Sequence, residues 1–150
     1  MCDFDPRCDC GGDLVGNALT QIASGHWSVT AVYGDDEHAP FAYTTGLIEF
    51  DRPELVITGM DLLKACVELN EVAGRLIGDA DHLASSSAFP YIPVEVIDSS
   101  DLRVTRLLYG PAFAAVQLAW PDASMAYPWD RAYPADRRQP LLGIPLPHAA

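Results

Sequence analysis

Basic residues are scarce in this sequence. Lysine and arginine together number 9 in 150 residues, against 21 aspartates and glutamates, and Lys64 is the only lysine. The resulting net charge of −12 repels the phosphate backbone of nucleic acids and the anionic headgroups of membranes. We therefore expect neither nucleic acid nor a membrane surface among the partners of this protein.

Long apolar segments and catalytic signatures are missing as well. No apolar run approaches the roughly 20 residues that a transmembrane helix needs, and the first residues lack the basic-then-apolar pattern of a secretion signal. We therefore expect a soluble protein of the cytoplasm whose thiols are reduced. The sequence also has no Gly-x-Ser-x-Gly motif, so it carries no sign of the serine hydrolases that use one.

Alternating side chains predict most of the secondary structure. In residues 41–47, aromatic and β-branched side chains recur at a period of two, which is typical of a strand. Residues 55–58 are almost wholly apolar and predict a strand that is covered on both faces. Pro93 cannot donate to a ladder and predicts an edge strand. Further strands are expected at residues 27–33, 91–97, 102–109 and 112–120.

Two segments carry the period of an amphipathic helix. They are residues 13–24, which Gly25 ends, and residues 61–77, where an apolar stripe includes Cys66. Because Cys66 lies on that stripe, we expect it to be a buried core side chain rather than a nucleophile. The elements together predict one α+β domain over residues 13–150, with a mainly antiparallel sheet of about five to six strands and two packed helices.

Three of the four cysteines lie in an N-terminal arm, residues 1–12, at Cys2, Cys8 and Cys10. Such a cluster allows a zinc site, which a distant histidine or cysteine would have to complete. The pair at 8 and 10 is closer than the usual zinc spacing, and neighbouring aspartates disfavour the thiolate form. Reactive thiols and a purely structural arm are the alternatives to metal binding.

Several short motifs follow one another in a recognisable order. They are Phe41-Ala-Tyr-Thr-x-Gly-Leu, Pro53-Glu-Leu with Gly59, Gln117-Leu-x-Trp-Pro-Asp122, Pro128-Trp129-x-x-x-Tyr133 and Gln139-Pro-Leu-Leu-Gly143. Together they resemble a bacterial family catalogued as domain of unknown function 4262, over roughly residues 25–145. The resemblance implies no activity and no catalytic residue, because the family is named for the lack of an assigned function.

Aromatic and acidic residues within these motifs suggest a ligand-binding cleft. Prolines stiffen the loops that carry several of them, and rings with carboxylates suit a small polar or cationic ligand. The alternative is that the aromatic residues plug one end of the core while the aspartates cap turns. The candidate ligand-binding residues are His26, Tyr43, Glu54, Gln117, Asp122, Trp129, Asp130 and Tyr133.

Three functions are compatible with these features. The first is a module that binds a small molecule or a protein partner where strand 41–47 meets the loops of residues 120–133, with Tyr43, Trp129 and Asp130 as the main contacts. The second is a flavin-dependent enzyme, by analogy with small split barrels, although no basic cluster is present to hold a phosphate. The third is a thiol- or zinc-dependent protein that uses the N-terminal cysteines.

Overall fold

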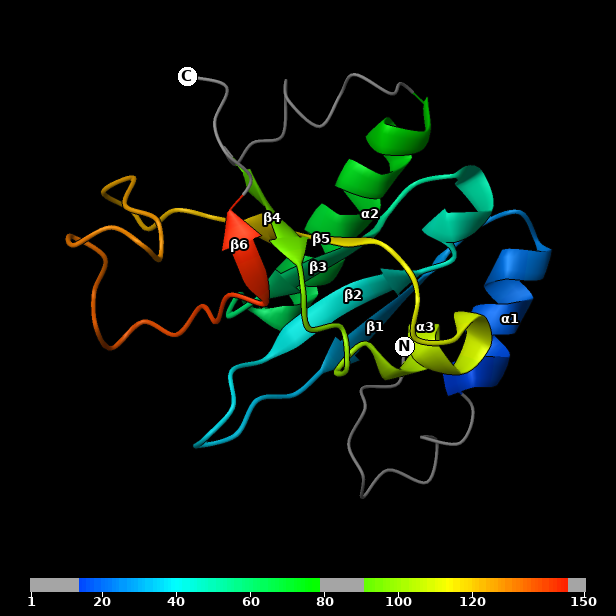
Figure 1. Ribbon diagram of the computed structural model, residues 1–150, viewed down its shortest axis with the longest axis horizontal. Helices are drawn as coiled ribbons and strands as arrows, with labels where there is room; N and C mark the ends of the chain where they lie inside the picture. Colours follow the sequence, from blue (N-terminus) through cyan, green and yellow to red (C-terminus); the bar gives the residue numbers. More distant parts are fainter. Residues whose placement is uncertain (1–13, 79–90, 146–150) are drawn as a thin grey trace.

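A single six-stranded sheet forms the centre of the protein, as shown by a computed structural model that describes residues 14–78 and 91–145 (Figure 1). The strand order is β1-β2-β3-β5-β4-β6, and every neighbouring pair is antiparallel except β3 with β5. This arrangement confirms the predicted α+β class. The strands are β1 Ser28–Val32, β2 Phe41–Thr45, β3 Glu54–Thr58, β4 Ile92–Val96, β5 Ala115–Ala119 and β6 Gly143–Pro145.

Helices cover both faces of the sheet (Figure 1). The long helix α2, Leu62–Gly78, packs its apolar stripe on the face that carries Ala42 and Ile57. The shorter helices α1, Leu14–Ala23, and α3, Arg103–Tyr109, cover part of the opposite face. None of the helices in the described residues is long and apolar enough to cross a membrane.

The register of the strands places a row of side chains across the second face. Thr30 pairs with Tyr43, Tyr43 with Val56, and Val56 with Gln117. The first three lie in the part of the sheet that α1 and α3 cover, whereas Gln117 lies under the chain segment 138–142. This face is therefore covered by helices at one end and by an extended segment at the other.

The expected strand at residues 102–109 is wrong, because residues 103–109 form helix α3, a third helix where two were predicted. Its buried side chains are Val104 and Thr105, which are adjacent and cannot share one face of a strand. The Tyr43 hydroxyl accepts the N–H of Val104 at 3.0 Å and so satisfies one of the donors that a helix leaves free in its first turn. That partner lies 61 residues away, so a local pattern could not reveal it.

The expectation that Pro93 marks an edge strand is also wrong, because β4 lies between β5 and β6. Pro93 pairs with Leu118 of β5, while the register with β6 runs only from Val94 to Val96. Pro93 is therefore tolerated although it has no N–H, because the ladder between β4 and β6 begins only at Val94.

The prediction for Cys66 is confirmed, because its side chain is 6% exposed and lies in the core under α2. Cys2, Cys8 and Cys10 lie outside the described residues. Within residues 14–78 and 91–145, no group of three histidine, cysteine, aspartate or glutamate side chains could hold a metal ion. Zinc binding by the N-terminal arm stays a prediction.

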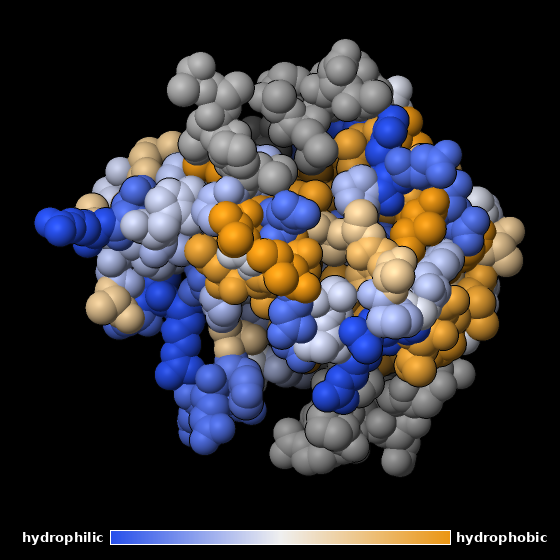
Figure 2. Space-filling model, in the orientation of Figure 1, coloured by the Kyte–Doolittle hydropathy of each residue, from blue (hydrophilic) through white to orange (hydrophobic). Residues whose placement is uncertain are grey.

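The split-barrel analogy does not extend to the sheet itself. The strand order is linear and ends at β1 and β6, so the described sheet is open rather than closed on itself. Figure 2 shows hydrophilic residues on the loop between β1 and β2 and a hydrophobic area over β6, where Ile144 is 64% exposed.

Candidate ligand-binding site

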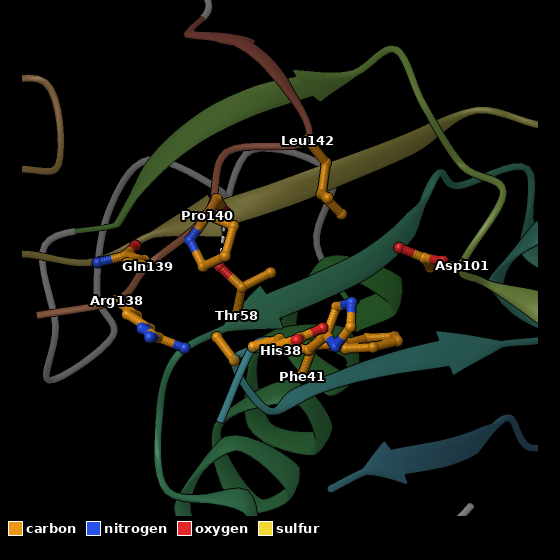
Figure 3. Close-up of a pocket in the computed structure, with 10 residues that line it drawn as sticks. His38, Phe41, Thr58, Asp101, Arg138, Gln139, Pro140 and Leu142 are labelled. Atoms are coloured by element: carbon orange, nitrogen blue, oxygen red, sulfur yellow. Dashed lines mark hydrogen bonds between the residues drawn. The ribbon is translucent and has the colours of Figure 1, made fainter. Parts of the chain in front are cut away.

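A pocket of about 460 Å³ opens on the second face of the sheet, beside the segment 138–142 (Figure 3). Phe41 and Thr58, which pair in the register of β2 and β3, come from its sheet side. Pro140 and Leu142 come from the extended segment. We call this cavity the Phe41 pocket; charged and polar groups also line it, namely Glu37, His38, Asp101, Arg138 and Gln139.

The loop between β1 and β2 supplies one wall, and its own hydrogen bonds fix its shape. The Asp35 carboxylate accepts the backbone N–H groups of Glu37 and His38 at 2.8 and 2.7 Å. These N–H groups, with the nearby His38 ring, hold the pKa of Asp35 below its ordinary value. Gly34 is required at the base of the loop, because a Cβ there would lie 2.7 Å from the backbone oxygen of His38 and from Pro40.

The opposite wall is the segment 138–142, which the side chain of Gln117 attaches to the sheet. The Gln117 amide nitrogen donates to the carbonyl of Pro140 at 2.8 Å, and its amide oxygen accepts the N–H of Leu142 at 2.8 Å. Thr58 donates to the same Pro140 carbonyl at 2.7 Å. Two buried side chains on neighbouring strands therefore decide where this wall lies.

Two further contacts hold the segment where it enters the pocket. Gln139 exchanges hydrogen bonds with the backbone of Trp120, receiving its N–H at 2.9 Å and donating to its carbonyl at 2.8 Å. Gly59, with a φ of 76°, faces the backbone of Arg138, and a Cβ at Gly59 would lie 2.1 Å from the Arg138 oxygen. Only glycine fits this close approach in the left-handed region.

The charges around the pocket are not equivalent. The Arg138 guanidinium donates to the backbone carbonyl of Asp36 at 2.7 Å and thereby joins the two walls. His38 lies 3.0 Å from the carboxylate of Asp35. Within the described residues, the carboxylates of Glu37 and Asp101 have no ion-pair or hydrogen-bond partner. The basic groups are thus already engaged, while two acidic groups remain available to a ligand.

Comparison with protein-family models matches residues 21–134 to the family described as Domain of unknown function (DUF4262). The chain belongs to the DUF4262 family. Comparisons with curated proteins and with solved structures give no match. The matched span of this DUF4262 domain includes Phe41, Thr58 and Asp101, whereas residues 138–142 follow it.

Of the residues predicted from sequence, Gln117 has the most direct connection with the Phe41 pocket, as the support of its wall. Tyr133 contacts a residue of the pocket wall, because its hydroxyl accepts a hydrogen bond from the side-chain amide of Gln139 at 3.1 Å. Tyr43 is 1% exposed and lies in the core, where its ring stacks on Phe41 at 6.0 Å. His26 is exposed just beyond the end of α1.

The two aspartates of the proline-rich loop have local partners. Asp122 accepts the backbone N–H groups of Ser124 and Ala126 at 2.8 and 2.9 Å. Asp130 accepts the backbone N–H of Tyr127 at 2.8 Å. In the DUF4262 domain described here, both carboxylates hold turns, which is the role that the alternative reading of the sequence gave them.

Glu54 is fully buried at the other end of β3, away from the Phe41 pocket. Its carboxylate accepts the N–H groups of Gly46 and Leu47 at 2.8 and 2.9 Å and the Thr44 hydroxyl at 3.0 Å. Burial raises the pKa of Glu54 from 4.5 to about 7, against the opposing effect of these donors. The carboxylate organises the turn that leads into the short helix η2, Leu47–Phe50.

The structure does not bring Tyr43, Trp129 and Asp130 together. Tyr43 contacts α3, whereas Trp129 stacks on Tyr127 at 5.3 Å in a loop beyond the end of β5 (Figure 1). The pocket instead uses the first residue of β2, the last of β3 and a segment near the C-terminus. Nothing in the local sequence indicates that His38 and the segment 138–142 lie on opposite sides of one pocket.

Exchange of Trp129 for alanine is expected to cost about 1 kcal/mol or less in unfolding free energy, because the side chain is 39% exposed. Trp120→Ala is the matched comparison. Its indole N–H donates to the Thr58 carbonyl at 2.9 Å and its ring packs on the core, so we expect a loss of about 3 kcal/mol. Urea denaturation of both variants measures the difference, and equal losses would contradict the placement of Trp129.

Proposed function

We propose that this domain binds a small amine with an apolar or aromatic body in the Phe41 pocket. The observation that carries the proposal is the combination of apolar walls with two acidic groups that have no partner within residues 14–78 and 91–145. Phe41, Pro140 and Leu142 offer surface to the body of the ligand, and Glu37 and Asp101 offer charge to its amine.

The overall charge supports the same ligand class. A net charge of −12 attracts small cations to the surface and raises their local concentration before any specific contact forms. The basic groups at the pocket are less available to an anionic ligand than the acidic groups are to a cationic one, because Arg138 donates to a backbone carbonyl and His38 lies beside Asp35. A cationic ligand therefore meets favourable charge both at a distance and at the rim.

The test compares three probes that share a phenyl ring and differ in charge: 2-phenylethylamine, 2-phenylethanol and 3-phenylpropionate. We expect the amine to bind with a Kd of roughly 0.1–1 mM by protein-observed NMR titration, and the alcohol several-fold more weakly. The anion is expected to bind most weakly of the three. Because the attraction is partly electrostatic, about 0.5 M salt should weaken the amine and leave the alcohol unchanged.

Two variants locate the binding. Asp101→Asn is expected to weaken the amine about three- to tenfold and to leave the alcohol unaffected. Asp136→Asn makes the same charge change at an exposed residue that does not line the pocket and is expected to change neither. Equal binding of amine and alcohol, or equal effects of the two variants, would refute an amine site in the Phe41 pocket.

A further inference from the structure

We propose that a second pocket, at the outer edge of β1, binds a neutral polyhydroxylated molecule of the size of a monosaccharide. This pocket has a volume of about 460 Å³ and lies where α1 and α2 approach the first strand. We call it the β1-edge pocket. Its lining residues are Leu14, Asn17, Ala18, Thr20, Gln21, Trp27, Ser28, Val29, Thr30 and Asn70.

Among the described residues, the lining contains no ionisable side chain, although 20% of the residues in the chain are charged. Six of the ten lining residues carry a hydroxyl or a carboxamide. Each of these groups both donates and accepts hydrogen bonds, which is also the property of the hydroxyl groups of a sugar or polyol. A charged ligand would lose its hydration here without gaining a counter-charge, so the pocket favours a neutral one.

The polar side chains face the pocket because their spacing along each element places them on the same side of the helix or strand. Asn17 and Gln21 are four residues apart on α1 and therefore share one helix face. Ser28 and Thr30 are two residues apart on β1 and therefore share one face of the strand. Asn70 reaches the pocket from α2. Because β1 is the first strand in the sheet order, its outer backbone groups have no partner strand among the described ones.

The hydrogen bonds within the pocket leave several groups available. Trp27 donates its indole N–H to the Asn70 side-chain oxygen at 3.0 Å, which fixes both residues between β1 and α2. The side chains of Asn17 and Gln21 make no hydrogen bond within the described part of the chain. A ligand therefore meets a fixed aromatic residue and two exposed carboxamides that have no partner among the described residues.

The Ser28 hydroxyl gives the most specific indication of a missing partner. It is the one buried side-chain polar atom in residues 14–78 and 91–145 that has no hydrogen-bond partner. A buried hydroxyl without a partner costs stability, and this one belongs to a residue that lines a polar pocket, so a ligand that shifts the atoms now covering the hydroxyl would supply the missing partner. The β1-edge pocket and the Phe41 pocket have no lining residue in common.

The experiment uses D-glucose, D-ribose and myo-inositol as probes, with D-glucuronate and D-glucosamine as charged counterparts, in saturation-transfer NMR on the full chain. We expect at least one neutral probe to bind with a Kd of about 1 mM, and both charged counterparts to bind more weakly. Gln21→Ala and Asn17→Ala should each weaken that probe about three- to tenfold. Ser24→Ala, an exposed position of the α1 end outside the pocket, should leave it unchanged.

Ser28→Ala separates a binding role from a structural one. Removing an unsatisfied hydroxyl should leave the Tm of the free protein unchanged or raise it by roughly 2–4 °C, while binding of the neutral probe falls about three- to tenfold. A lower Tm would mean that the hydroxyl has a structural partner, and would overturn the proposal. It is equally overturned if no neutral probe binds, or if Gln21→Ala binds like Ser24→Ala.

Discussion

Replacement of Glu54 by leucine is expected to lower the free energy of unfolding by roughly 3–5 kcal/mol. The leucine side chain can fill the volume but cannot accept the N–H groups of Gly46 and Leu47, which the carboxylate now receives at 2.8 and 2.9 Å. Both residues are buried, so water cannot replace the lost acceptor. Urea denaturation at pH 6, followed by tryptophan fluorescence, measures the loss.

Glu49→Leu provides the matched control for this substitution. Glu49 lies in the adjoining helix η2, is exposed and accepts only the Tyr109 hydroxyl at 3.0 Å among the described contacts. We expect its replacement to cost about 1 kcal/mol or less. If Glu54→Leu were as stable as Glu49→Leu, the carboxylate would not be organising the turn.

The pH dependence of stability follows from the same residue. Burial raises the pKa of Glu54 from 4.5 to about 7, so the folded state binds this proton more tightly than the unfolded chain does. Its contribution is complete below pH 4.5 and is lost as the pH rises through 7, to an extent of about 3 kcal/mol. Folding lowers the pKa values of Asp35, Asp98 and Asp122, so these residues have the opposite effect on stability. Their contribution is present at neutral pH and is lost only as the pH falls below 3.8, outside the range in which Glu54 titrates.

The difference in unfolding free energy between the wild type and Glu54→Gln, measured between pH 5 and pH 7.5, therefore reports on Glu54. We expect the wild-type stability to fall across this interval and the slope to flatten in Glu54→Gln, which cannot titrate. The glutamine retains one acceptor oxygen, so the variant should keep more stability than Glu54→Leu. Equal slopes in the wild type and Glu54→Gln would contradict the raised pKa of Glu54.

Substitution of Gln117 by leucine is expected to cost roughly 2–4 kcal/mol and to release the segment 138–142 from the sheet. The Gln117 side chain is fully buried and bonds to Thr58, Pro140 and Leu142 at once. Leucine leaves the Leu142 N–H without its acceptor and removes one of the two donors to the Pro140 carbonyl. The Phe41 pocket should lose its second wall, and the amine probe its binding.

Trypsin measures this release directly, because Arg137 and Arg138 lie at the start of the segment. We expect cleavage there to be faster in Gln117→Leu than in the wild type, under conditions in which the folded protein survives. Thr58→Val serves as the graded control, since Gln117 still donates to Pro140 and accepts from Leu142. It should cost about 1 kcal/mol, and cleavage equally slow in all three proteins would show that Gln117 does not hold the wall.

Local periodicity was sufficient for most of the elements, and it failed where a distant partner mattered. The alternation in residues 41–47 and the apolar run at 55–58 correspond to β2 and β3, because both patterns follow from how a strand exposes its two faces. The sequence of residues 102–109 shows the same alternation of side chains, yet residues 103–109 form α3. The hydroxyl of Tyr43 in β2 accepts a backbone N–H of the first turn of this helix. A contact of this kind has no signature within the segment itself.

The amino-acid sequence by itself determined the acidic character, the class of fold, the burial of Cys66 and membership of the DUF4262 family. These properties depend on composition, on periodicity and on motifs that can be read along the chain. Only the tertiary structure decided which side chains share a cavity, since Phe41 and Leu142 meet on one face of a sheet whose strand order departs from the chain order. Burial and pairing of charge depend on those meetings, so the acidic residues available to a ligand emerge only once the chain is folded.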